Sequence, residues 1–323
     1  MRIWVVMLAV MVFLMVGMSA TAAPTPKRTV VSLTFDGSYR GQDVAAKILA
    51  DHDMAGTFFV NSAYIGYPAY LSLDSLRAIA RERNEIGGGS LYGNDLSKET
   101  RKRAGAEVCN DRATLAQLGF QVTSFAYPHA ASPPMVKSVV QGCGYNSARE
   151  TSGLYARADC SSCPDAEQFP VRDDFRIRTA DTTVGLDLLQ AQVVRAEQHG
   201  GWLPLVFTYI CDCANKAGSI SPGTFETFVQ WLGTRPATTT VATVDQVMGG
   251  PLKSVVGKPV ERLVPSPSRA ISRVPASKRP AVVFFGIEIG QSQILFVGIV
   301  LAIGITLSYR FASRGNRYVR SRT

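Results

Sequence analysis

Between residues 28 and 250 the sequence alternates short β-rich runs with longer segments of helical period. Strands are predicted at 29–35, 57–61, 85–88, 122–127, 145–148, 203–210 and 239–243. Helices are predicted between them, at 42–52, 73–83, 98–118, 186–199 and 225–232. Such alternation is typical of parallel strands joined by crossover helices. About seven units in roughly 220 residues fit a barrel better than an open sheet, so we expect an α/β fold, a distorted (β/α) barrel of about seven parallel strands.

The carboxyl ends of the predicted strands carry four polar segments, at 36–38, 89–93, 127–129 and 208–212. In a barrel these ends surround one mouth, where the chemistry of such folds is found. We therefore expect the four segments to converge. The candidate ligand-binding residues among them are Tyr127, Pro128, His129, Thr208, Tyr209 and Asp212.

Two of these segments contain glycines within a recognisable frame, LTFDGS at 33–38 and EIGGGSLYG at 85–93. Together with VSLTFD at 31–36, GTFFVN at 56–61, NEIGG at 84–88, SFAYP at 124–128 and TVDQV at 243–247, they resemble the polysaccharide deacetylase family, the NodB-homology domains of carbohydrate esterase family 4. The resemblance covers most of residues 29–250 and implies the same distorted barrel.

The resemblance also implies a mechanism that this chain departs from. The family uses a divalent metal such as zinc, and Gly37, Gly89 and Gly93 stand where it places the metal-binding Asp, His and His. Asp36 stands at the position of the family's catalytic base. Neither Thr208 nor Tyr209 supplies the imidazolium that acts as the acid. The arginine that orients the base is also missing from 124–128, so we expect no metal and impaired catalysis, because the lost acid alone costs roughly 10²- to 10⁴-fold.

A rewired site is the alternative. The chain has three histidines, and only His129 lies at the predicted mouth. One histidine with Asp36 and Asp212 could bind a metal or divide the acid and base roles. The plainer interpretation is that His129 points into a solvated loop.

The cysteines number six, at 109, 143, 160, 163, 211 and 213. An even number in an exported chain favours disulfides, and the sequence does not choose among the pairings. The competing interpretation is a zinc site built from Cys160 and Cys163 with Cys211 and Cys213, since paired thiolates suit tetrahedral zinc. The disulfide candidates are Cys109, Cys143, Cys160, Cys163, Cys211 and Cys213.

The two ends of the chain have compositions of their own. Residues 1–23 are predicted to be a signal peptide, because an apolar run follows Arg2. Residues 251–288 are rich in Pro, Ser and basic residues and are predicted to be a linker. Residues 289–309 carry no charge and are long enough for a transmembrane helix, and the basic tail at 310–323 favours a cytoplasmic C-terminus. We therefore expect a single-pass plasma-membrane protein with an extracellular barrel at 28–250.

The net charge of +9 does not indicate nucleic acid. Between residues 24 and 250 there are 21 Lys and Arg against 23 Asp and Glu, so the excess lies in the linker and the tail. The expected partners are a cell-wall or other extracellular polysaccharide and the membrane.

These observations lead to a first hypothesis, a membrane-anchored, catalytically silent deacetylase relative that binds saccharide with the help of Tyr39, Tyr92, Tyr127 and Tyr209. The alternatives are an active hydrolase of acetylated glycans with a rewired site and an envelope protein-interaction module. A sensor that signals through the span has little support, because a tail of about 14 residues is too short for a folded domain.

Overall fold

The computed structural model describes residues 27–155, 160–182, 185–213, 216, 218–261, 283–284 and 287–288. They fall into two units, Met1–Arg262 and Leu263–Thr323. In the second unit β11 (Val283–Phe284) pairs antiparallel with β12 (Ile287–Glu288). The predicted signal peptide, the predicted span at 289–309 and the basic tail lie outside the described residues. Within the described ranges, no helix has both the length and the apolar character needed to cross a bilayer.

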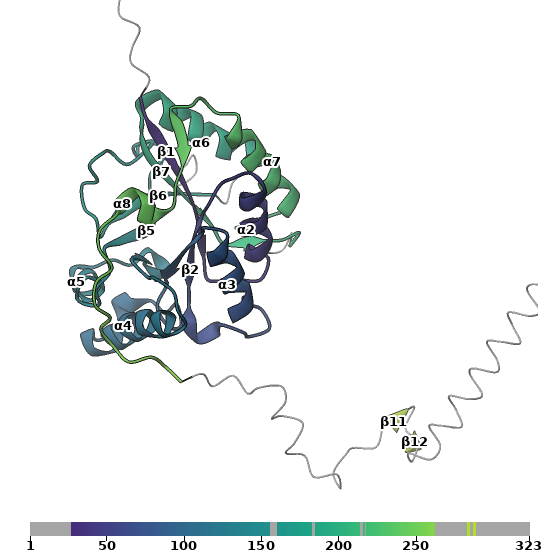
Figure 1. The fold of residues 1–323 in the computed structure, drawn as a ribbon, viewed down its shortest axis with the longest axis vertical. Coiled ribbons are helices and arrows are strands. Elements are labelled where there is room, and N and C mark those ends of the chain that lie inside the picture. The colour runs from purple at the N-terminus through teal and green to yellow at the C-terminus, as the bar shows by residue number, and fades with distance from the viewer. Residues whose placement is uncertain are drawn as a thin grey trace, which may run out of the picture. The chain divides into compact units, whose positions relative to one another are not determined.

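The first unit is a barrel of parallel strands, drawn in Figure 1. Its strands pair in chain order, and β7 closes the ring by pairing with β1 in register from Thr29 opposite Gly201 to Phe35 opposite Phe207. The expected barrel of seven parallel strands is therefore confirmed. The seven strands are β1 (Thr29–Asp36), β2 (Thr57–Val60), β3 (Glu85–Gly88), β4 (Ser124–Ala126), β5 (Ser147–Gly153), β6 (Ile177–Asp181) and β7 (Gly201–Phe207).

One predicted strand has a different role. The segment predicted at 239–243 forms β10 (Thr239–Val241), which pairs with the first half of β1, while β2 pairs with its last residues. The strand β10 is thus inserted between β1 and β2 at one end of the barrel. The seventh barrel strand is β6, which the hydrophobic pattern did not predict.

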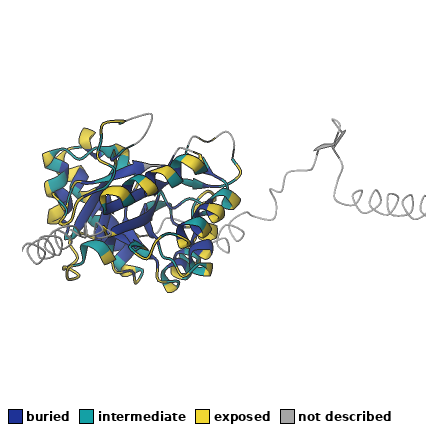
Figure 2. Ribbon diagram, turned by 90° about the horizontal axis from the view of Figure 1, so that it is seen from above, coloured by how far each residue is buried: buried dark blue, intermediate teal, exposed yellow. Residues whose placement is uncertain are grey.

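Helices cover the outside of the barrel, and in Figure 2 their outer faces are exposed around a buried sheet. Several begin at a side chain that accepts a backbone N–H: Ser72 before α3, Thr100 before α4, Ser221 before α7, and Thr243 in a capping box with Gln246. The helices of this unit are α2 (Gln42–Asp51), α3 (Leu73–Arg81), α4 (Arg101–Gln117), α5 (Pro134–Gly142), α6 (Leu186–His199), α7 (Pro222–Gly233) and α8 (Val244–Met248). The short 3-10 helices are η1 (Ser62–Tyr64), η2 (Leu96–Lys98) and η3 (Pro128–Ala130), and a small pair of strands, β8 (Tyr209–Ile210) and β9 (Ser219–Ile220), follows β7.

Strand β1 is the centre of the core. Every residue from Thr29 to Thr34 is buried, which is typical of a parallel strand covered on both faces. Two of its buried hydroxyls are paired: Ser32 donates to the carbonyl oxygen of Ala242 at 2.6 Å, and Thr34 donates to that of Leu205 at 2.8 Å. Only Asp36, at the carboxyl end, reaches the mouth with a partly exposed side chain.

Disulfides are confirmed for all six cysteines. Cys109 on α4 pairs with Cys143 after α5, across 34 residues. The other two bonds close short loops, Cys160 with Cys163 and Cys211 with Cys213. The zinc site that would have combined these last two pairs is therefore wrong, because each pair is bonded within itself.

The first part of the predicted linker packs on the barrel. Residues 251–261 run along α4, where the guanidinium of buried Arg112 donates to the carbonyl oxygens of Lys253 and Ser254 at 2.8 and 2.9 Å. Further along, the N–H of Lys258 donates to Asn110 and that of Val260 to Thr114. The contacts of the barrel domain thus extend to the end of this segment, beyond the boundary predicted at residue 250.

Candidate functional site

A pocket of about 360 Å³ opens at the carboxyl ends of the barrel strands. Its wall takes residues from the segments after β1, β3, β4 and β7, so the four segments expected to meet at the mouth do so. The lining residues are Asp36, Gly37, Tyr39, Phe59, Asn61, Gly89, Gly93, Ala126, Tyr127, Pro128, His129, Thr151 and Thr208.

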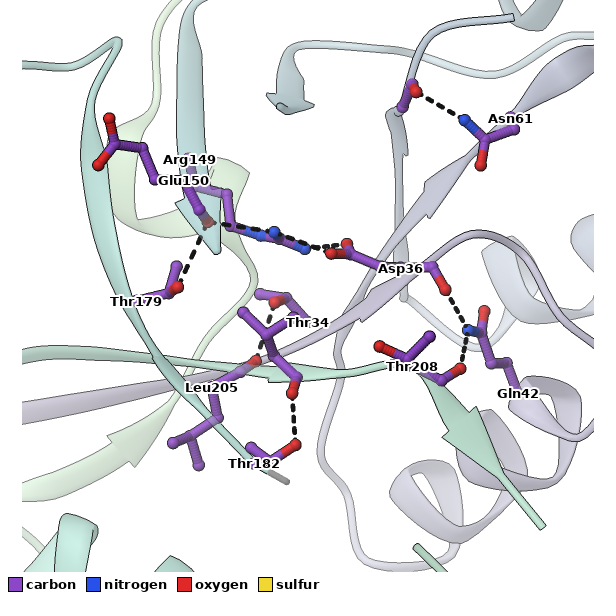
Figure 3. A network of polar contacts seen from close by, with 12 residues as sticks. Thr34, Asp36, Gln42, Asn61, Arg149, Glu150, Thr179, Thr182, Leu205 and Thr208 are labelled. Carbon is purple, nitrogen blue, oxygen red and sulfur yellow. Dashed lines mark hydrogen bonds and ion pairs between the residues drawn. The ribbon is translucent and has the colours of Figure 1, made fainter. Parts of the chain in front are cut away.

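The one carboxylate in the pocket wall is held by a buried arginine (Figure 3). Both terminal nitrogens of Arg149, on β5, donate to the carboxylate of Asp36, one of them to Oδ2 at 3.1 Å. The Arg149 side chain is fully buried and that of Asp36 is 23% exposed. The guanidinium also lies over the ring of Phe59, 4.4 Å from its centroid. Two parallel hydrogen bonds and this stacking fix the carboxylate in one orientation.

Gln42 ties the ends of two strands together beneath this ion pair. Its Nε2 donates to the carbonyl oxygens of Asp36 at 2.7 Å and Thr208 at 2.8 Å, as Figure 3 shows. Because Thr208 follows β7 and Asp36 ends β1, one buried side chain holds two walls of the pocket in register. Thr208 contributes to the pocket wall at the position where the family has its acid.

There is no room for a side chain at Gly37, the first of the three glycines at the family's metal-binding positions. Gly37 has φ +83°, a conformation in which L residues are strained. A Cβ added there would lie 2.5 Å from Cε2 of Tyr39, so that ring occupies the space that a ligand side chain would need.

Asn61 fills the corresponding space at the other two positions. A Cβ at Gly89 would lie 3.1 Å from its Nδ2, and a Cβ at Gly93 would lie 3.2 Å from the same atom. The amide is fixed there, because Nδ2 donates to the carbonyl oxygens of Gly89 at 2.6 Å and Ser90 at 3.0 Å. Gly93 also has a left-handed φ of +68°.

The family's divalent metal does not fit this pocket. Glycine has no donor atom in its side chain, and all three positions are glycine. In the part of the chain that the structure describes, no three His, Cys, Asp or Glu side chains gather as a metal site requires. Of the residues that the family resemblance assigns to the site, the carboxylate at Asp36 is present, and its partner is Arg149 from β5.

The residues of the rewired site do not all come together. His129 lines the pocket with Asp36, and its φ of +56° is left-handed. Asp212 is exposed and does not line this pocket, nor does Tyr209. Tyr127 lines it but is buried, and its hydroxyl donates to the carbonyl oxygen of Phe175 at 3.1 Å. Burial also raises the pKa of Tyr127 well above its ordinary value.

Tyrosines gather beside the pocket. We call this group the tyrosine cluster: its ring contacts run from Tyr209 to Tyr39 (4.5 Å between centroids), on to Tyr70 (5.2 Å) and to Tyr64 (4.7 Å). From Tyr64 they branch edge-on to Tyr67 at 6.1 Å and Tyr92 at 5.8 Å. Of the four tyrosines expected to contact saccharide, three belong to the cluster and Tyr127 does not.

A buried carboxylate lies behind the glycine segment. Asp111, on α4, accepts the N–H of Ser62 at 2.9 Å with Oδ1, and its Oδ2 has no hydrogen-bond partner among the described residues. A Cβ at Gly88 would lie 3.0 Å from that Oδ2. Burial raises the pKa of Asp111 to about 7.

Sequence reasoning missed Arg149 and Asn61. The predicted strand at 145–148 stopped one residue before Arg149, whereas β5 runs on to Gly153. Arg149 pairs in register with Ala126, within the segment whose arginine is missing. A lone arginine at the end of a buried strand was the available signal for it. Asn61 belongs to the segment GTFFVN at 56–61, which resembles the family, but its place in that segment does not predict that it lies beside two glycines.

The comparisons with known proteins agree with the fold and the motifs. Residues 23–148 match the sequence profile of the family described as polysaccharide deacetylase. The predicted resemblance to the polysaccharide deacetylase family is thereby confirmed over this stretch, which ends just before Arg149. No curated protein matches the chain.

Solved structures of this fold are similar to the chain at low identity. A Mycobacterium smegmatis protein, provisionally described as a polysaccharide deacetylase, is 14% identical, with a TM-score of 0.53 over 71% of this chain and 91% of that one. A Streptococcus pyogenes deacetylase, in complex with acetate, is 22% identical, with a TM-score of 0.39 over 50% of this chain and 68% of that one. A mutant of a CE4 family pseudoenzyme with restored enzymatic activity is 16% identical, with a TM-score of 0.47 over 69% of each chain.

Proposed function

We propose that this protein is a catalytically silent relative of the polysaccharide deacetylases that binds polysaccharide at the barrel mouth. The observation that carries the proposal is the state of the three glycine positions. Each lacks a donor, and the space beside it is occupied by Tyr39 or Asn61. The pocket itself is kept, with Asp36 held in place by Arg149.

The pocket wall supports a saccharide ligand. It combines the apolar surfaces of Phe59 and Ala126 with the polar side chains of Asn61, His129 and Thr208. Concave sites of this kind, with a few fixed polar groups, suit a small uncharged ring that carries hydroxyl groups. Asp36 and Arg149 cancel each other's charge, so the pocket has no strong preference for an ionic ligand.

The export and anchoring of the domain belong to the same proposal. An apolar start, an uncharged run at 289–309 and a basic tail support a single-pass plasma-membrane protein with the barrel outside the cell. Its disulfides suit an oxidising compartment. The polysaccharide would then be a cell-wall or other extracellular polymer.

The test uses the full chain, freshly purified. We expect retention on insoluble peptidoglycan, chitin or xylan, no stoichiometric zinc, and no acetate release from acetylated glycans. A variant with the pocket filled, Ala126→Trp, should lose retention, whereas Val194→Trp on the exposed face of α6 should keep it. A chain that is retained on none of the polymers would refute the proposal.

One observation favours a second candidate, an active hydrolase of acetylated glycans. Asp36 and His129 line one pocket, so a carboxylate and an imidazole are both available to a bound substrate. This candidate predicts acetate release that Asp36→Asn and His129→Ala each abolish. The same assay therefore separates the two functions.

A further inference from the structure

We propose that the tyrosine cluster is a second binding surface, which extends the pocket so that the protein holds several consecutive sugars of a neutral polysaccharide. This inference rests on the proposed saccharide-binding function and adds the length and the charge of the ligand. The cluster consists of Tyr39, Tyr64, Tyr67, Tyr70, Tyr92 and Tyr209.

The cluster is continuous with the pocket. Tyr39 belongs to the pocket wall and to the cluster at the same time, and Tyr92 is the neighbour of Gly93, which also lines the pocket. The rings come from the segments that follow β1, β2, β3 and β7. A ligand that leaves the pocket over these rings therefore passes along the rim of the barrel, over several successive loops.

Two rings of the cluster are available for stacking. Tyr67 is 41% exposed and Tyr92 is 43% exposed, the only tyrosines among the large exposed apolar residues that the structure describes. The interplanar angles to Tyr64 are 89° and 75°, so neither ring is stacked face to face on Tyr64. A sugar ring presents C–H groups on its face and hydroxyls at its edge, which suits an aromatic ring that ends in a hydroxyl.

The loops that carry these rings are held together. The backbone of Tyr39 forms an antiparallel bridge with that of Tyr70. The N–H of Arg40 donates to Ala69 at 3.0 Å, and that of Leu71 donates to Ser38 at 2.9 Å. Because the surface is already ordered, a ligand does not have to order it on binding.

The charge of the surface indicates a neutral ligand. Burial, followed by contacts with neighbouring tyrosines, raises the pKa values of Tyr39 and Tyr64 above the ordinary range, so these phenols stay protonated. Two charged residues that contact members of the cluster have opposite signs. Lys216 lies over Tyr209 at 4.5 Å, and Glu107 accepts the N–H of Tyr92 at 3.2 Å. An anionic polymer would gain little here, whereas uncharged sugars find hydroxyls and ring faces.

The experiment compares short and long ligands on the full chain. Calorimetric titrations use dimers and hexamers of N-acetylglucosamine and, in a second arm, of xylose. We expect one of the two sugars to bind about tenfold more tightly as the hexamer, since two stacked rings supply a difference of that order. The double variant Tyr67→Ala and Tyr92→Ala should abolish this advantage and leave dimer binding unchanged, and the corresponding double Phe variant should keep it.

The matched control is Phe169→Ala, which removes a ring that is 45% exposed and packs on Arg28, at the start of β1 and away from the mouth. It should not change either affinity. Equal binding of dimer and hexamer by the wild type, or a hexamer advantage that survives in the double Ala variant, would overturn the inference alone. No binding of either length of either sugar would overturn the inference, and it would overturn the proposed function as well if the chain is also retained on none of the three polymers.

Discussion

Arg149, on β5, and Asp36, at the carboxyl end of β1, form an ion pair that joins two different walls of the barrel. The pair holds the Asp36 carboxylate in one orientation, in a pocket where the described residues form no metal site. It also has a structural role, because the guanidinium is completely buried and needs a counter-charge.

The first prediction concerns this pair. Asp36→Asn leaves a buried guanidinium without its counter-charge and should lower the free energy of unfolding by about 3 kcal/mol. Arg149→Met should cost less, because the carboxylate that remains is partly exposed. A double-mutant cycle by urea denaturation measures the coupling. The exposed pair of Lys47 and Asp51 serves as the control and should couple by less than about 1 kcal/mol. A coupling for Asp36 and Arg149 as small as that of the control would contradict the prediction.

The second prediction concerns the three glycines. The triple variant Gly37→Asp, Gly89→His and Gly93→His should be less stable than the wild type, because positions 37 and 93 are left-handed and a Cβ costs about 1–2 kcal/mol there. It should bind little zinc while the neighbouring ring and amide fill the space.

The companion to that variant adds Tyr39→Ala and Asn61→Ala, which clear the space beside the three positions. We expect this five-fold variant to retain about one zinc ion per chain after dialysis, measured by elemental analysis. Stoichiometric zinc in the triple variant at wild-type stability would show that the two neighbours are no obstacle.

The third prediction is a pH dependence of stability. Burial raises the pKa of Asp111 from an ordinary value of 3.8 to about 7. The folded protein therefore keeps a proton that the unfolded chain releases between these values, and stability should fall as the pH rises from about 4 to about 7 and then level off. The loss should amount to a few kcal/mol, at about 1.4 kcal/mol per unit.

Denaturation midpoints at several pH values test this dependence. Asp111→Asn, which can still accept the N–H of Ser62, should flatten the decline. Some slope of the same sign should remain, because burial also raises the pKa values of Glu85 and Glu107. Asp74→Asn, at an exposed carboxylate, should keep the wild-type slope. An unchanged slope in Asp111→Asn would mean that this carboxyl is ionised in the folded protein.

The fourth prediction concerns the strained backbone at His129 and Ala130, with φ values of +56° and +55°. His129→Gly and Ala130→Gly should each raise the free energy of unfolding by about 1 kcal/mol. Ala131→Gly, at a φ of −95°, is the matched control and should be destabilising instead. Only His129→Gly should also weaken saccharide binding, because that side chain lines the pocket. Equal binding by His129→Gly and the wild type would remove the residue from the site.

The fifth prediction concerns the longest disulfide loop. Replacing Cys109 and Cys143 with Ser removes a crosslink across 34 residues and should lower stability by about 2–4 kcal/mol. Replacing Cys160 and Cys163 should have a smaller effect, since that bond closes a loop across 3 residues. Thermal denaturation under non-reducing conditions provides the comparison. Equal losses in the two variants would contradict the loop-length argument.

Much of the fold could be predicted from periodicity, because buried parallel strands are nearly continuous apolar runs and β1 is such a run. Strand β6 could not, since its sequence, IRTAD, has neither an apolar run nor strict alternation. The segment at β10 has strand character, but its pairing with the first half of β1 depends on the tertiary structure, which the local sequence does not show. The extended segment at 251–261 has no periodicity, and it is ordered by side chains of α4 such as Arg112.

The sequence predicted those parts of the site that lie within one contiguous segment, and it did not predict side-chain contacts between segments. The glycines and Asp36 could be assigned because the frame around them is contiguous in sequence. The partner of Asp36 lies 113 residues away, on a strand whose predicted boundary was too short. Asn61 was visible as a residue, but its contact with two glycines 28 and 32 positions later depends on how β2 and β3 pair.

The pairing of β1 with β10 also places both described ends of the barrel domain relative to the pocket. Thr29 opens β1 beside Thr239, so the chain enters and completes the barrel at the end opposite Asp36. The segment at 251–261 then leaves along α4, and it contributes nothing to the pocket wall. Among the described residues, neither end of the barrel domain therefore borders the mouth, so a ligand at the rim meets the loops that follow the strands and not the segments by which the chain enters or leaves the barrel.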